Sequence, residues 1–110
     1  MSNEFLKRIK NHFSREELLE ILTDLVKVPS ENPPGDESQI SKACKKWLDK
    51  LGFDTEVFTT TEKRVNIIAT KTWGKKGRTL IWSGHMDVVP AGDPNLWNYP
   101  PYGVSVIKNR

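Results

Sequence analysis

The sequence is poor in the residues that define several large classes of protein. Cys44 is the only cysteine among 110 residues, so no disulfide can form within the chain; such sparing use of cysteine fits a reducing compartment. No apolar run approaches the roughly 20 residues of a membrane-spanning helix. The first residues also lack the basic start and apolar stretch of a secretory signal. These absences predict a cytoplasmic protein that has no membrane partner.

Charge of one sign is scarce as well. The formal net charge is only +3, and 17 basic residues are mixed with 14 acidic ones. Nucleic-acid-binding domains gather basic residues on one face, so this balance argues against a nucleic-acid partner. One denser basic group, interpreted as a charged hairpin turn, comprises Lys71, Lys75, Lys76 and Arg78. No internal repeat or low-complexity tract divides the sequence, so residues 1–110 are treated as one unit.

A helix is predicted over residues 14–28, after a shorter amphipathic one over residues 4–11. Ser14 and Glu17 have the spacing of an N-terminal capping box. Phe13, just before the cap, can pack as a hydrophobic staple against the first apolar residue of the helix. One helical face carries apolar residues at the spacing of a buried surface: Leu18, Ile21, Leu22, Leu25 and Val26.

A further helix is predicted over residues 37–51, after a stiff proline-rich loop over residues 29–35. Asp36 can cap its start, and Gly52 can adopt the left-handed conformation that ends helices. Its apolar stripe consists of Ile40, Ala43, Cys44, Trp47, Leu48 and Leu51. Because Cys44 lies in that stripe, it is interpreted as a small buried hydrophobic residue.

Strands are predicted in the second half, over residues 53–60 and 65–71. The continuous apolar run at 67–69 indicates a strand covered on both faces. Residues 80–82 form another apolar run, which predicts a buried strand. A last strand begins at 104–108 and has no later segment to pair with, so the sequence looks cut within a hairpin. Two helices followed by three strands, one of them strongly buried, predict an α/β sheet layered with helices.

The residues after the 80–82 run can bind a metal. Gly84 permits a sharp turn, and His85 and Asp87 follow two positions apart. In extended backbone such residues face the same side, and ligands of open α/β sheets bind beyond strand ends. Imidazole is a common metal ligand whose second nitrogen usually donates to a carboxylate. The alternative interpretation is a pair of loop residues bonded to backbone, since short motifs mislead.

The wider sequence resembles the M20 metallopeptidase family. Residues 83–92, Ser-Gly-His-Met-Asp-Val-Val-Pro-Ala-Gly, are similar to its metal-ligand segment, and the 29–35 loop is similar to a proline-rich segment after its first helix. Trp97 followed by Pro-Pro-aromatic also fits, although the family more often has Phe where this chain has Tyr102. The resemblance runs from about residue 14 to residue 108. The family includes acetylornithine deacetylases, succinyl-diaminopimelate desuccinylases, aminoacylases and glutamate carboxypeptidases.

This resemblance implies the N-terminal part of a three-layer α/β/α zinc-peptidase-like catalytic domain. In the family site two zinc or cobalt ions share a bridging water. His85 would bind one ion, and Asp87 would be the catalytic residue that orients His85. The substrate would be a small N-acyl amino acid or a peptide. The remaining ligands, the general base and the dimerisation domain of a possible homodimer do not occur in these residues.

Two alternatives to an N-acyl amino acid deacylase stay open. One is a dipeptidase or carboxypeptidase of the same kind. The other is a binding module derived from the family without catalysis. A catalytic zinc site generally has three protein ligands, and the only other histidine, His12, has no ligand-like context. The chain alone is therefore expected to be inactive.

Overall fold

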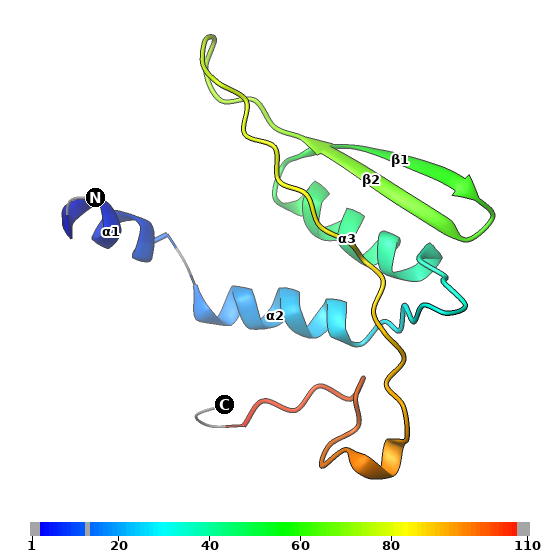
Figure 1. Cartoon of the computed structure of the whole chain (residues 1–110). Coiled ribbons are helices and arrows are strands. Elements are labelled where there is room, and N and C mark those ends of the chain that lie inside the picture. The colour runs from blue at the N-terminus through cyan, green and yellow to red at the C-terminus, as the bar shows by residue number, and fades with distance from the viewer. Residues whose placement is uncertain (1–2, 13, 108–110) are drawn as a thin grey trace.

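The computed structural model describes residues 3–12 and 14–107 (Figure 1). It contains both helices and strands, which is compatible with an α/β chain. Within the described residues no helix has the length and apolar character needed to cross a membrane. The elements in order are α1 (Asn3–Lys10), α2 (Arg15–Val26), α3 (Ser38–Lys50), β1 (Asp54–Thr61), β2 (Arg64–Thr70) and the 3-10 helix η1 (Pro94–Leu96).

The start of α2 confirms the predicted N-cap. Ser14 has extended backbone, and its hydroxyl accepts a hydrogen bond from the backbone N–H of Glu17 at 3.2 Å. That bond satisfies one of the N–H groups that a helix leaves without a partner at its start. The expected staple residue Phe13 lies outside the described residues.

Both ends of α3 follow from its flanking residues. The Asp36 carboxylate accepts a hydrogen bond from the backbone N–H of Ser38 at 3.0 Å. Asp36 therefore provides a partner for one N–H group of the first turn, although Glu37 occupies the N-cap position. Gly52 has φ +78°. The next residue, Phe53, donates its N–H to the Leu48 carbonyl at 3.0 Å, which closes the helix end in the predicted left-handed manner.

The two strands form an antiparallel hairpin, with Asp54 opposite Thr70 at its open end. α3 packs on one face of this sheet. Side chains of β2 alternate between the covered and the open face, as the period of a strand requires, and Ile68 is 56% exposed. The prediction that residues 67–69 are covered on both faces is therefore wrong, because α3 covers only one face.

The predicted strand at residues 80–82 is also absent, and Figure 1 draws this stretch as an irregular chain. Leu80, Ile81 and Trp82 are 82–90% exposed. Strands gain stability from cross-strand pairs, and no described segment pairs with this one. An apolar run alone does not provide that partner.

The strand predicted at residues 104–108 is likewise not formed over 104–107, and Lys108 lies outside the described residues. Val104 has φ +46°, a left-handed conformation that a β-branched residue rarely adopts and that is incompatible with a strand.

The best-buried apolar residues lie on α3. Ile40 and Trp47 are 5% and 3% exposed, and the Trp47 indole N–H donates to the Asp24 carboxylate of α2 at 3.1 Å. The Lys50 ammonium lies 4.2 Å from the centre of the Trp47 ring. Trp47 therefore joins α2 to α3 by packing and by a polar contact.

We expect Trp47→Ala to lower the free energy of unfolding by about 3–5 kcal/mol, as measured by urea denaturation, because it leaves a large cavity. Trp47→Phe keeps most of the volume and loses the bond to Asp24, so its cost should be smaller. Trp73→Ala is the control, because Trp73 is 73% exposed. Equal losses for Trp47→Ala and Trp73→Ala would contradict this description of the core.

Candidate functional site

The candidate site forms where the proline-rich loop meets the residues after the glycine turn. Glu31 and Val88 form a parallel bridge. The Asn32 N–H donates to the Val88 carbonyl at 2.8 Å, and the Val88 N–H donates to the Ser30 carbonyl at 3.0 Å. The Ser30 hydroxyl, on a residue only 3% exposed, donates to the Met86 carbonyl at 2.7 Å. These bonds fix the backbone on both sides of Asp87.

His85 and Asp87 come together as the sequence predicted. Nδ1 of His85 lies 3.0 Å from Oδ1 of Asp87 and 2.7 Å from its backbone carbonyl oxygen. Both acceptors face the same ring nitrogen, so Nδ1 carries the proton that they share. The His85 side chain is 82% exposed, and Nε2 is the nitrogen that this arrangement leaves for coordination.

The Asp87 carboxylate is held from its other side as well. Its Oδ2 accepts a hydrogen bond from Nδ2 of Asn32 at 2.8 Å and lies 3.8 Å from Nη2 of Arg64. The hydrogen bond from Asn32, with a smaller contribution from His85, holds the pKa of Asp87 below its usual value despite partial desolvation. Asp87 therefore stays ionised at neutral pH and remains an acceptor for the hydrogen bond from Nδ1–H of His85.

Arg64 links Asp87 to a buried carboxylate. Glu37 has a side chain only 5% exposed, and its Oε2 lies 3.1 Å from Nε of Arg64. A buried charge is costly unless it is paired, which explains why Arg64 turns toward the start of α3. Gly35 makes room for this arginine: it has φ +83°, and a Cβ atom there would lie 2.0 Å from Nη1 of Arg64.

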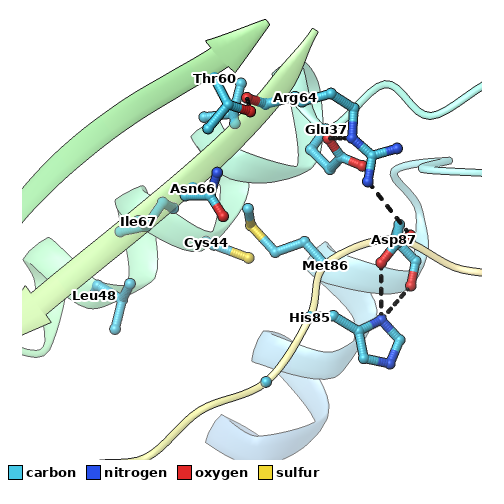
Figure 2. A pocket seen from close by; sticks show the side chains of 12 residues that line it. Glu37, Cys44, Leu48, Thr60, Arg64, Asn66, Ile67, His85, Met86 and Asp87 are labelled. Atoms are coloured by element: carbon cyan, nitrogen blue, oxygen red, sulfur yellow. Dashed lines mark hydrogen bonds and ion pairs between the residues drawn. The ribbon is translucent and has the colours of Figure 1, made fainter.

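A cavity of about 510 Å³ opens beside these groups (Figure 2). His85, Met86 and Asp87 line it on one side, and α3 and β2 contribute residues such as Cys44 and Ile67 on another. Burial raises the pKa of the Cys44 thiol, so Cys44 is a poor nucleophile at neutral pH. This agrees with its interpretation as a small hydrophobic residue.

The chain past the site is tied to the same loop by Glu31. Its Oε1 accepts from the Tyr102 hydroxyl at 2.6 Å and from the Ala91 N–H at 2.9 Å, while the Trp97 indole donates to the Ala91 carbonyl at 2.9 Å. The bond to Glu31 raises the pKa of Tyr102 to about 12. Tyr102 thus has a partner that phenylalanine in its place would lack.

A complete metal centre is not assembled by the described residues. No group of three or more histidine, cysteine, aspartate or glutamate side chains within residues 3–12 and 14–107 is arranged to hold a metal ion. His85 fits the role of one ligand, with its second nitrogen fixed by a carboxylate. His12 lies in the turn after α1 and does not line the cavity.

Sequence analysis missed the residues that hold Asp87. Asn32 and Ser30 lie in the loop that was predicted to be stiff and similar to a family segment, but no contact with the residues around Asp87 was assigned to them. Arg64 and Glu37 were not singled out. The prolines did signal that this loop is stiff, which suits a support for another segment. No spacing rule relates Asn32 to a residue 55 positions later, so the contact could not be derived from local pattern.

The chain is similar to proteins named as hydrolases. It is 37% identical over 90 residues to a probable succinyl-diaminopimelate desuccinylase of Staphylococcus aureus strain Mu50, a match that covers 82% of this chain and 22% of that protein. A protein of the same name from Staphylococcus epidermidis strain RP62A is 33% identical over 89 residues, covering 81% and 21%. The chain thus spans about a fifth of the length of these relatives. No protein-family model matches it.

The Tyr102–Glu31 bond predicts a pH dependence. In a Tyr99→Phe background Tyr102 is the only tyrosine, and its absorbance should titrate near pH 12. Because this folded-state pKa lies above the ordinary value of 10.0, the bond stabilises the fold fully below about pH 10 and is lost as pH rises toward 12. Glu31→Gln should return the titration toward the ordinary value. An unchanged titration in Glu31→Gln would show that Glu31 is not the cause.

Proposed function

We propose that the chain belongs to a metal-dependent hydrolase of amide bonds of the M20 kind, in which His85 is a metal ligand and Asp87 orients it. The observation that carries the proposal is the pairing of His85 Nδ1 with Asp87 at 3.0 Å, which leaves Nε2 to coordinate. The hydrolase names of the relatives support the same class. We further propose the cytoplasm as its location.

The proposed metal is Zn²⁺ or Co²⁺, with two ions in the complete site; when bound, such ions acidify water and polarise the scissile carbonyl. Asp87 keeps the proton on Nδ1 of His85 and prevents the ring from turning. The low pKa of Asp87 keeps that carboxylate charged at neutral pH. Within residues 3–12 and 14–107 no group of three or more histidine, cysteine, aspartate or glutamate side chains is placed to hold a metal ion, so we propose that these residues alone do not catalyse the reaction.

The names of the relatives support a proposal for the substrate class. A desuccinylase cleaves the amide between a succinyl group and an amine, so we propose an N-acyl amino acid, with succinyl as the acyl group tested first. The other ligands and the general base would come from polypeptide outside these residues, as the greater length of the relatives allows. A three-layer α/β/α catalytic domain and a homodimer are part of the same proposal.

The test uses the ¹⁵N-labelled 110-residue chain titrated with Zn²⁺. We expect the Nε2 resonance of His85 to shift first, and binding to be weak, because a single imidazole cannot compete with water and buffer for zinc. His85→Ala should abolish the effect, whereas His12→Ala should leave it unchanged. The chain should not hydrolyse N-succinyl amino acids or dipeptides.

Three outcomes would contradict the proposal or one of its parts. A Zn²⁺ effect confined to His12, or directed to Nδ1 of His85, would remove the ligand assignment. Measurable hydrolysis with tight binding at one site would show that the chain completes its site by another route, for example with a second copy. Binding of an N-acyl amino acid without any response to metal would favour the non-catalytic binding module.

A further inference from the structure

We propose that Asn32 is a positioning residue that strengthens the preference of His85 for presenting Nε2 for coordination. Asn32 acts through Asp87, because it holds the carboxylate that accepts a hydrogen bond from Nδ1–H of His85. The metal role of His85 rests on the proposed function, but the positioning itself concerns only this chain. Nothing in the spacing of the sequence assigned Asn32 this role.

Asn32 is bonded to two consecutive residues of the site. Its backbone N–H donates to the Val88 carbonyl at 2.8 Å, and its side-chain amide donates to Oδ2 of Asp87 at 2.8 Å. The backbone hydrogen bond fixes the position of the Asn32 backbone, from which its side-chain amide extends. The side-chain hydrogen bond fixes the orientation of the Asp87 carboxylate. The carboxylate therefore cannot rotate without breaking a well-formed hydrogen bond.

Among the described lysines and arginines, Arg64 is the one that the structure pairs with Asp87, and its geometry is poorer than that of Asn32. Nη2 of Arg64 lies 3.8 Å from Oδ2 of Asp87, beyond hydrogen-bond distance, whereas its Nε lies 3.1 Å from Glu37. Arg64 therefore contributes charge near Asp87, while Asn32 contributes direction. This difference assigns the positioning role to the uncharged residue.

Asn32 affects His85 through the second oxygen of the Asp87 carboxylate. With Oδ2 occupied by Asn32, Oδ1 faces Nδ1 of His85 at 3.0 Å. The Asp87 carbonyl oxygen, at 2.7 Å from the same nitrogen, is a further acceptor that does not depend on the Asn32 side chain. Loss of the Asn32 amide should therefore weaken the preference for the Nδ1–H tautomer without abolishing it.

The experiment measures the tautomer of His85 in the 110-residue chain by ¹⁵N NMR at alkaline pH, in samples whose ring ¹⁵N shifts show that the imidazole is neutral. In the parent chain His85 should be mainly the Nδ1–H form, with Nε2 unprotonated. In Asn32→Ala and Asn32→Asp the Nδ1–H fraction should fall toward the value of His12, which serves as an internal reference in the same sample.

A matched control is available at the start of η1. The Asn95 amide donates to the Asp93 carboxylate at 2.9 Å, in an exposed pair with no histidine in it. Asn95→Asp should leave the His85 tautomer unchanged. The backbone amide shift of Val88 reports whether the bridge survives in each variant.

The results separate this proposal from the proposed function. An Nδ1–H fraction in Asn32→Ala and Asn32→Asp equal to that of the parent, with the Val88 amide unchanged, would overturn the positioning role while leaving His85 free to be a ligand. If both variants lose the bridge, the test is made on the parent chain instead. The absence of a nuclear Overhauser effect between the Asn32 side-chain amide and Asp87 would then overturn the positioning role of Asn32. A tautomer change without any Zn²⁺ effect at His85 would support positioning and contradict the metal assignment.

Discussion

The parallel bridge between residues 30–32 and 86–88 is the constraint on which the rest of the site depends. Its backbone bonds have lengths of 2.8 and 3.0 Å, and the buried Ser30 hydroxyl adds a third bond at 2.7 Å. The bridge fixes the backbone of the segment carrying His85 against the proline-rich loop. With the bridge in place, Asp87 lies within reach of Asn32, Arg64 and His85 at once.

The charged groups around this bridge are connected through a series of pairwise contacts. Glu37 is buried at the start of α3 and requires a cation, which Arg64 provides at 3.1 Å. The same arginine lies close to Asp87, and Gly35 leaves the space that its guanidinium occupies. Asp87 in turn fixes His85. The buried Glu37 carboxylate at the N-cap of α3 thus accounts for the position of Arg64, and through Arg64 for the positive charge near Asp87.

The sequence was informative wherever a local rule applies. Ser14, Asp36 and Gly52 marked helix ends because caps satisfy backbone groups within a few residues. His85 and Asp87 could be paired because they lie only two positions apart in the sequence. The run at 80–82 was misassigned because a strand needs a neighbour, which apolar character alone does not specify. Asn32 and Arg64 were missed because their contacts to Asp87 join distant parts of the chain, and no periodicity encodes them.

Amide hydrogen exchange, read residue by residue, tests most directly whether the bridge holds the site. The account predicts that the N–H groups of Asn32 and Val88 exchange slowly and lose protection together, because each donates across the bridge. The N–H groups of Leu80 and Ile81, in the exposed stretch before the site, should exchange rapidly. Rapid exchange at Asn32 and Val88, matching that of Leu80, would contradict the claim that this bridge positions His85 and Asp87.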